Sequence, residues 1–182
     1  NRSEVPVVSF FPEQPDFSID TLFLKGDWYT QIKCRMKDPP GEDYYAIRVL
    51  GIENDDDSLV VRTEAIETTG EPILNNYNTG NDRFNTSNDF YHNFYIFDDT
   101  GITDSLYTLH LNMPERDYIE SYKVQFFHIS REFYKYMKSL NNINNNDFGN
   151  YGLSLIRPTY TNIQKGAGIL GAYSMTESKW LK

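Results

Sequence analysis

Apolar and polar side chains alternate between Trp28 and Lys37, and this pattern constrains the fold more than any other feature of the sequence. Successive residues of a β-strand point to opposite faces of a sheet. An alternation over ten residues therefore predicts a long strand with one buried face. Its apolar face carries Trp28, Ile32, Cys34 and Met36. Cys34 is the single cysteine of the chain, and we expect a buried, unmodified thiol there.

The same alternation, together with the turns that interrupt it, predicts further strands. Pro39, Pro40 and Gly41 are typical of a tight turn, and the polar run at residues 54–58 indicates a second one. Short polar connections of this kind favour antiparallel strands joined as a meander. We predict strands over residues 28–37, 44–52, 59–63, 90–97, 105–113 and 122–129, a long loop over residues 68–88, and an extended segment over residues 1–25.

One segment has helical periodicity. Phe133, Tyr136, Met137 and Leu140 recur at three- and four-residue spacing, which gives a helix one apolar face. Ser130 is the expected N-cap, because its hydroxyl can accept a hydrogen bond from the first turn. A single short helix in a β-rich chain is expected to cover an open end or face of the sheets.

Length and composition favour one globular domain. A chain of 182 residues supplies one good-sized core, and 39% hydrophobic with 24% charged residues is a globular composition. We therefore predict an all-β fold, a single antiparallel β-sandwich domain over residues 1–182 with one short helix near residues 130–140. Its architecture is expected to be immunoglobulin/fibronectin-like or jelly-roll-like, and residues 28–49 look like the start of a fibronectin-type sandwich.

Charge and motif content weigh against several functions. A net charge of -9 without a basic stripe argues against nucleic acid as a partner. A single cysteine allows neither an internal disulfide framework nor a zinc-finger site. Residues 166–171 match the dinucleotide pattern G-x-G-x-x-G, but the strand–helix–strand unit around it is missing, so we interpret this segment as a glycine-rich strand that another backbone approaches closely.

No catalytic or metal-ligating constellation stands out. His92, His110 and His128 follow no metal-binding spacing, although the last two are candidates for neighbours across a sheet. The acidic turns at residues 55–57 and 98–104 lack the order of a calcium-binding loop, and we interpret them as solvated turns. A glycan-processing enzyme would need two carboxyl groups facing each other across an aromatic-walled cleft, and no pair is singled out among 26 acids. We predict no catalytic residue, no cofactor and no metal.

Three segments together resemble one protein family. Residues 37–48, with the sequence KDPPGEDYYAIR, are similar to its D-P-x-G-E-x-Y-Y turn and strand. Residues 129–136 resemble its S-x-E-Y-Y-x-Y helix, and residues 160–173 resemble its closing Y-x-N-I-x-x-G-x-G-I-F-G segment. The family is catalogued as domain of unknown function 4249. The chain departs from these patterns at Phe133, where tyrosine is usual, and at Leu170, where an aromatic residue is usual.

The resemblance implies an exported lipoprotein of the bacterial outer membrane, commonly encoded beside a TonB-dependent receptor. An additional N-terminal region and the lipid anchor of such a protein would lie outside this chain, and the anchor would be its contact with the membrane. The family has no established activity, so no catalytic residue can be transferred. We expect a non-catalytic accessory binding component of a nutrient uptake system at the cell surface, with a TonB-dependent outer-membrane receptor as its partner.

Two alternatives are a glycan- or peptide-binding module and a glycan-processing enzyme. A partner-docking module needs a flat, exposed apolar or aromatic patch. A glycan- or peptide-binding module needs a groove with exposed tyrosine or tryptophan. Tyr44, Tyr45, Phe90 and Tyr91 are the candidates for such a groove, and the competing interpretation is that both pairs are half core and half strand surface.

Overall fold

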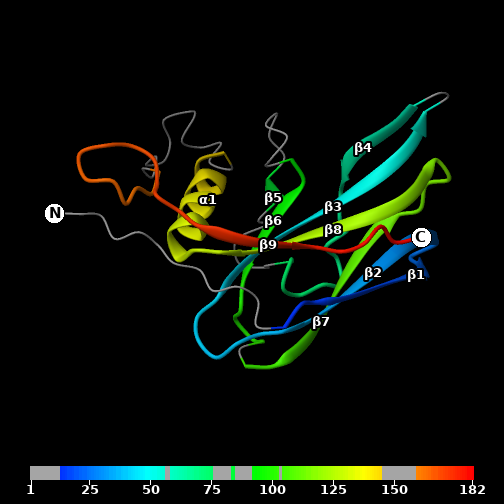
Figure 1. Ribbon diagram of the computed structural model, residues 1–182, viewed down its shortest axis with the longest axis horizontal. Helices are drawn as coiled ribbons and strands as arrows, with labels where there is room; N and C mark the ends of the chain where they lie inside the picture. Colours follow the sequence, from blue (N-terminus) through cyan, green and yellow to red (C-terminus); the bar gives the residue numbers. More distant parts are fainter. Residues whose placement is uncertain (1–12, 56–57, 76–82, 85–91, 103, 145–158) are drawn as a thin grey trace.

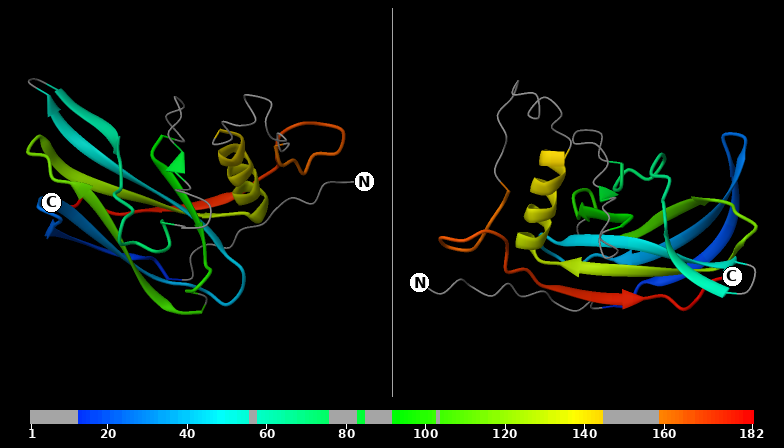
Figure 2. Two further views of the ribbon diagram at one scale, coloured as in Figure 1. Left: turned by 180° about the vertical axis from the view of Figure 1, so that it is seen from behind. Right: turned by 90° about the horizontal axis from the view of Figure 1, so that it is seen from above.

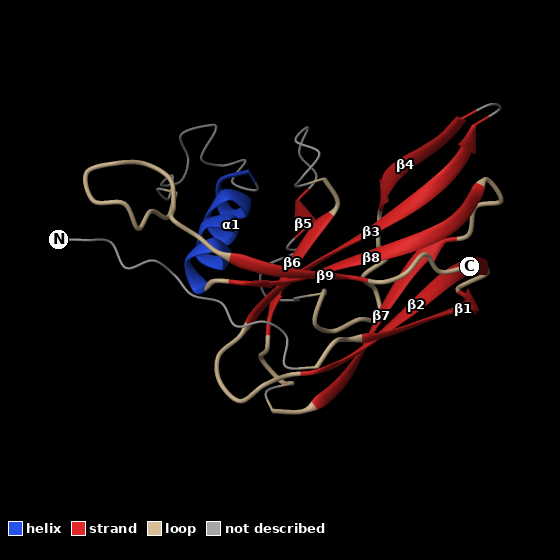
Figure 3. Cartoon of the chain, in the orientation of Figure 1, coloured by secondary structure: helices blue, strands red, loops and turns tan. Residues whose placement is uncertain are grey.

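Two antiparallel β-sheets and one α-helix make up the described part of the molecule (Figure 1 and Figure 3). The computed structural model describes residues 13–55, 58–75, 83–84, 92–102, 104–144 and 159–182. Within these residues no helix is long and apolar enough to span a membrane. The elements are β1 (Asp16–Leu24), β2 (Asp27–Lys37), β3 (Tyr44–Asp55), β4 (Ser58–Glu64), β5 (Arg83–Phe84), β6 (Phe94–Asp98), β7 (Leu106–Pro114), β8 (Ile119–Ile129), α1 (Arg131–Asn144) and β9 (Tyr173–Glu177).

The predicted antiparallel β-sandwich with one short helix is confirmed. A three-stranded sheet has the order β1-β2-β7, and a six-stranded sheet has the order β5-β6-β3-β8-β9 with β4 also paired to β3. Both sheets are seen from behind and from above in Figure 2. Strands β1, β2 and β7 lie in one sheet and β3, β8 and β9 in the other, which is how an immunoglobulin-like sandwich distributes its A, B, E and C, F, G strands.

The core between the sheets is built from the faces that the alternation predicts. Ile32, Cys34 and Met36 of β2 are buried, with Cys34 fully enclosed. The facing strands also contribute every second residue. The other buried members of this core are Tyr45, Ile47, Val49, Ile66, Leu74, Tyr95, Phe97, Ile102, Leu109, Leu111, Met113, Tyr122, Val124 and Phe126.

A second apolar layer lies between α1 and the opposite face of the six-stranded sheet. Ser130 caps the helix as predicted, because its Oγ accepts a hydrogen bond from the backbone N–H of Phe133 at 3.3 Å. Phe133 and Met137 face the sheet, as their spacing predicts. The central strands are therefore covered on both sides at this end of the molecule. The buried sheet residues under α1 are Tyr44, Ala46, Phe94, Ile96, Phe127 and Ile129.

The six-stranded sheet forks at β3. Residues 44–47 of β3 pair with β6, while residues 49–55 pair with β4. The opposite edge of β3 pairs with β8 along its length. The chain between β4 and β6 is fastened at the fork by Tyr95, whose hydroxyl accepts the N–H of Ile66 at 2.8 Å and donates to the Ile66 carbonyl at 3.1 Å.

A buried carboxylate in that connection protects the outer edge of β7. Glu71 is buried, and its Oε2 accepts the backbone N–H of His110 at 2.8 Å. Its Oε1 accepts the hydroxyl of Tyr107 at 2.6 Å. Burial, and then this hydrogen bond, raise the pKa of Tyr107. Exposed strand edges can pair with other chains, so occupying this N–H closes part of the edge.

Local structure differs from the predictions in several places. The segment predicted as extended over residues 1–25 contains a paired strand that was not predicted, β1, which pairs with β2 along its whole length. Its apolar residues change phase between Ile19 and Leu22, so no regular period of two marks it as a strand. The strand predicted from residue 90 begins in the described residues at Phe94, because Asn93 has a φ of 47° and interrupts extended backbone. The loop predicted over residues 68–88 contains β5, a two-residue strand.

The glycine-rich segment and the histidines also differ from expectation. Residues 163–168 form turns and bends, not a strand. Gly171 packs closely against α1, because an added Cβ would lie 3.2 Å from Cβ of Phe133. His110 and His128 are not neighbours across one sheet, since they belong to β7 and β8 in different sheets.

Cys34 gives a direct test of the sandwich core. The side chain is 0% exposed, and burial raises the pKa of its thiol well above the ordinary value. Because reaction requires opening of the core, a thiol reagent should label the folded protein at least about a thousandfold more slowly than the protein in guanidinium chloride. The single cysteine makes the signal unambiguous, and rapid labelling under native conditions would show that β2 is not packed as described.

Candidate functional site

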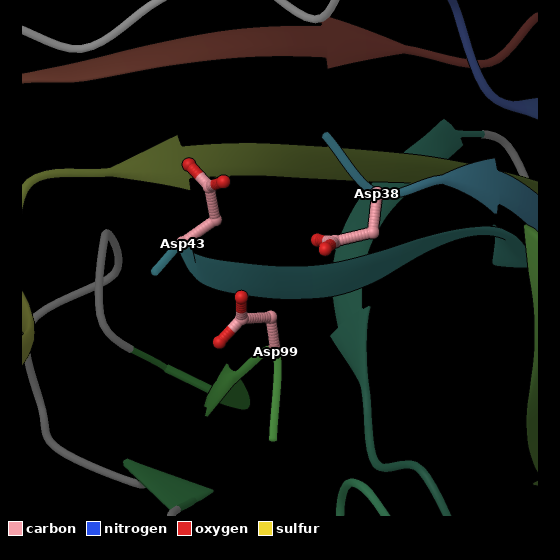
Figure 4. Close-up of side chains that lie close together, drawn as sticks. All are labelled: Asp38, Asp43 and Asp99. Atoms are coloured by element: carbon pink, nitrogen blue, oxygen red, sulfur yellow. The ribbon is translucent and has the colours of Figure 1, made fainter. Parts of the chain in front are cut away.

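Three aspartates from two turns that are distant along the chain meet at one end of the sandwich. Asp38 follows β2, Asp43 precedes β3, and Asp99 follows β6 (Figure 4). One carboxylate oxygen from each lies within 4.8 Å of the others. The strand register brings them together, since Tyr44 pairs with Asp98 and the N–H of Asp99 donates to the Asp43 carbonyl at 3.1 Å. We call these three residues the aspartate cluster.

Asp38 is the most enclosed member of the aspartate cluster. It is fully buried, and its Oδ1 accepts the hydroxyl of Tyr45 at 2.6 Å. Its Oδ2 accepts the backbone N–H of Asp104 at 3.2 Å. Burial has the largest effect on the pKa of Asp38 and raises it. The two hydrogen bonds act to lower this pKa, but they do not outweigh burial. Burial and the Asp38 carboxylate raise the pKa of Tyr45 as well.

A histidine extends the network. The Nε2 atom of His128 lies 2.6 Å from Oδ1 of Asp43. The imidazole ring also stacks on Tyr45, with ring centroids 5.3 Å apart. Tyr45 therefore links Asp38 to the His128–Asp43 pair, because its hydroxyl donates to Asp38 while its ring stacks on His128. Residues of β3, of β8 and of the turns that follow β2 and β6 thus form one polar cluster at the end of the apolar core.

The chemistry of the aspartate cluster is that of hard oxygen donors. Calcium and magnesium prefer such ligands, and these three side chains could supply part of a calcium shell of six to eight oxygens. Both carboxylate oxygens of Asp38 already accept hydrogen bonds from the protein. Asp38 and Asp99 are buried, so this cluster does not present two carboxyl groups to an open cleft as glycoside hydrolysis requires. Its hydrogen bonds tie two turns together.

Comparison with known proteins identifies the family. The sequence model described as "Domain of unknown function (DUF4249)" matches residues 8–179. The chain belongs to the DUF4249 family. No curated protein and no solved structure matches the chain. The family match extends the resemblance noted over residues 37–173 to most of the chain.

The structure assigns roles to the first two DUF4249 motifs. In the D-P-x-G-E-x-Y-Y segment, Asp38 accepts a hydrogen bond from the hydroxyl of Tyr45. The first and last residues of the motif are therefore bonded to each other across the β2–β3 turn. Gly41 in that turn has a φ of 140°, which favours glycine. In the S-x-E-Y-Y-x-Y segment, Ser130 is the helix cap and the hydroxyl of Tyr134 donates to Asp98 at 2.8 Å.

The third DUF4249 motif closes a loop. The Asn162 side chain both accepts the N–H of Leu170 and donates to its carbonyl, each at 2.8 Å. Thr161 donates to the Gly168 carbonyl at 2.7 Å. The loop ends at Gly171, which packs against α1. All three motifs therefore have structural explanations in this DUF4249 chain.

The tyrosines predicted to line a groove are buried. Tyr44 is 7% exposed and Tyr45 is 1% exposed. Tyr44 lies under α1, where its ring centroid is 4.6 Å from that of Tyr134, while Tyr45 points into the core between the sheets. Neither can stack on a ligand, because β3 is covered on both faces at this point. Phe90 and Tyr91, the other predicted candidates, lie outside the described residues.

The exposed aromatic residues of this DUF4249 chain are elsewhere. Phe23 and Trp28 are 57% and 56% exposed, with ring centroids 5.1 Å apart. They face each other across the β1–β2 turn, and we call this pair the hairpin tip. The alternation places Trp28 on the core face of β2, but its position next to the turn leaves it exposed. Gly26, which follows the apolar residues 22–24 and precedes Trp28 by two positions, is the turn signal that the sequence offers at this place.

Removal of one hydroxyl tests the Asp38–Tyr45 contact. Tyr45→Phe leaves Oδ1 of Asp38 buried without its tyrosine donor, so the free energy of unfolding should fall by roughly 1–3 kcal/mol. Tyr118→Phe is the matched control because Tyr118 is exposed, and its stability should be unchanged. Equal stability of the two variants in urea titrations would contradict the importance of the contact.

The raised pKa of Asp38 also predicts a pH dependence. Its ordinary value is 3.8, and the folded state holds the proton more tightly than the unfolded state. The stability of the wild type relative to Asp38→Asn should therefore be highest below this value and decrease as the pH rises through the folded pKa. Urea unfolding of both proteins between about pH 3 and pH 8 measures the difference. A difference that grows with pH would mean that the folded pKa is lowered.

Proposed function

We propose that this DUF4249 chain is a non-catalytic binding domain that acts at the bacterial cell surface as an accessory component of a TonB-dependent uptake system. The family resemblance supports this role, because it implies outer-membrane lipoproteins commonly encoded beside such receptors. A net charge of -9 is compatible with an exported, well-solvated domain. The partner in this proposal is a protein, the receptor itself.

The observation that carries the docking role is the exposed hairpin tip. Two large aromatic side chains stand next to a turn in which Lys25 and Gly26 have φ values of 55° and 98°. Positive φ at both central residues is typical of the tight type I′ turn, which projects the hairpin as a compact unit. Tryptophan and phenylalanine are enriched at the centre of protein interfaces, where they bury large apolar areas.

A neighbouring turn enlarges this aromatic surface. The backbone N–H of Glu115 donates to the Trp28 carbonyl at 3.0 Å, so the β7–β8 connection lies beside the hairpin tip. That connection carries Tyr118, which is also exposed. The β1–β2 and β7–β8 turns lie at the same end of the molecule, away from α1 (Figure 1). A partner could contact both turns at once.

A glycan- or peptide-binding role remains the second candidate, and it would use the same exposed aromatic residues. Tyr44 and Tyr45 no longer support it, because they are buried. A glycan-processing role finds less support in the described residues, where the aspartate cluster is enclosed by the β2–β3 turn and its neighbours. The two binding roles differ in partner class, so one set of variants can separate them.

The test is to capture the receptor with purified chain as bait. Outer membranes in mild detergent are passed over wild type, the double variant Phe23→Ser/Trp28→Ser, and Leu106→Ser. Leu106 is similarly exposed but lies at the far end of β7, so it is the matched control. We expect wild type and control to retain a TonB-dependent receptor identified by mass spectrometry, and the double variant to lose it.

The same three proteins are then applied to a glycan array. Glycan binding that depends on the hairpin tip, without capture of a receptor, would replace the docking proposal by the glycan-binding one. Capture that is equal for all three proteins would remove the hairpin tip from the interface. Absence of both receptor and glycan would refute the accessory role.

A further inference from the structure

Strand β4 lies at a margin of the six-stranded sheet. It pairs with β3 on one side, and no strand of the described structure pairs with its other side (Figure 2). An open strand edge presents unpaired backbone N–H and C=O groups, and it can accept a further strand. The exposed apolar side chains of β4 are Leu59 and Val61, which are 64% and 53% exposed on the same face of the sheet.

A backbone hydrogen bond of β3 shows which residues of β4 point towards the open side. In an antiparallel pair, residues that bond to the partner strand alternate with residues that point away from it. The N–H of Asn54 donates to the Tyr118 carbonyl at 3.1 Å, on the side of β3 that pairs with β8. Asn54 therefore points away from β4. Its opposite residue, Leu59, must then point away from β3.

A second hydrogen bond gives the same alternation. The Thr63 carbonyl accepts Nδ2 of Asn93 at 3.0 Å, so Thr63 also points away from β3. Val61 lies between Leu59 and Thr63 at a spacing of two, and its N–H and C=O groups point outwards with theirs. Asn93 occupies the Thr63 carbonyl, but no described group occupies those of Leu59 and Val61. We call residues 59–61 the β4 edge.

Other strand edges carry protective features that the β4 edge lacks. Glu71 accepts a backbone N–H on the outer edge of β7. Strand β1 carries Asp16 and Asp20, and these charges oppose pairing with another acidic chain. In β4, residues 58–61 contain neither a charged residue nor a proline. Arg62, the next residue, forms an ion pair within the β3–β4 hairpin. The β4 edge is therefore suited to pairing.

We propose that the β4 edge pairs with the β4 edge of a second copy of this chain, antiparallel and centred on Val60. In this register, Leu59 of each copy lies opposite Val61 of the other. Each of these two pairs exchanges both of its N–H···O=C bonds, so four backbone hydrogen bonds form. Val60 lies opposite Val60 of the second copy. The larger sheets of the two copies then become one continuous sheet.

Side chains and charge favour a second copy as the occupant. A two-fold axis matches each surface with itself, and here it places apolar Leu59 beside apolar Val61 twice. Arg62 lies opposite Ser58, which follows three successive aspartates in the sequence. Positive charge of one copy thus approaches the acidic β3–β4 turn of the other. Two short edge strands bury less than the roughly 1,200 Å² of standard interfaces, so we expect a weak dimer.

Proline at an outward-pointing residue tests the pairing. Sedimentation velocity at physiological salt, which screens the charge of -9 beyond about 8 Å, should show wild type passing from one chain to two as concentration rises. Val61→Pro removes an N–H without a bond in the single chain, so β4 should tolerate it. Dimerisation should weaken roughly tenfold or more, because two hydrogen bonds are lost. Leu106→Ser, exposed on the other sheet, is the control and should dimerise as wild type does.

Cysteine substitution tests the register. Residues opposite each other in a pair that is not hydrogen-bonded lie about 4.5 Å apart between Cα atoms, within reach of a disulfide. Val60→Cys should therefore form a covalent dimer under mild oxidation. Leu59→Cys is the control, because its two copies would be diagonal neighbours about 7–8 Å apart. Leu59 is more exposed than Val60, yet Val60→Cys should cross-link at least about tenfold faster, and the native Cys34 is buried.

Wild type that stays a single chain at every concentration would overturn the proposal, and so would faster cross-linking of Leu59→Cys. This second measurement also decides the question if Val61→Pro does not fold. The inference does not depend on receptor docking, so Phe23→Ser/Trp28→Ser should dimerise as wild type does. Loss of the dimer in that double variant would place the interface at the hairpin tip and refute pairing through β4.

Discussion

Burial of β3 on both faces is the constraint on which the rest of the structure depends. Tyr44 and Tyr45 are adjacent in sequence and point in opposite directions, one into the layer under α1 and one into the core between the sheets. A strand of this kind is stable only when something apolar covers each side. The three-stranded sheet supplies one cover and α1 supplies the other. Beyond the reach of α1, the outer face of the same sheet is exposed and carries the apolar residues Leu59 and Val61 beside polar and charged ones.

Much of the architecture follows from patterns in the sequence, because each pattern shows which residues share one face of a strand or a helix. The period of two in β2 placed Ile32, Cys34 and Met36 in the core, and the helical spacing of Phe133 and Met137 placed them against the sheet. The pattern could not reveal β1, whose apolar residues change phase halfway along the strand. It also could not distinguish a strand with one buried face from a strand that is buried on both faces. For this reason both interpretations of Tyr44 and Tyr45 left at least one of them at a surface.

The aspartate cluster was beyond sequence reasoning for a different reason. Its members belong to two turns that are distant along the chain, and the register between β3 and β6 brings them together. Each turn taken alone looks like ordinary solvated loop. The same holds for Arg48 and His92, which line one shallow concavity only because the sheet forks. By contrast, the contact between Asp38 and Tyr45 is local, because both residues belong to one family motif around the β2–β3 turn.

The fork at β3 has a consequence for how the chain folds. Strand β4 follows β3 directly and can pair with it early as a local hairpin, whereas β6 comes much later in the chain and must close a longer loop. Both compete for the same edge, so a hairpin that slipped towards the start of β3 would occupy the positions that β6 needs. The native alignment of Asp55 with Ser58 keeps that half of the edge vacant. The register of the β3–β4 hairpin thus determines whether β6, and β5 with it, can join the larger sheet.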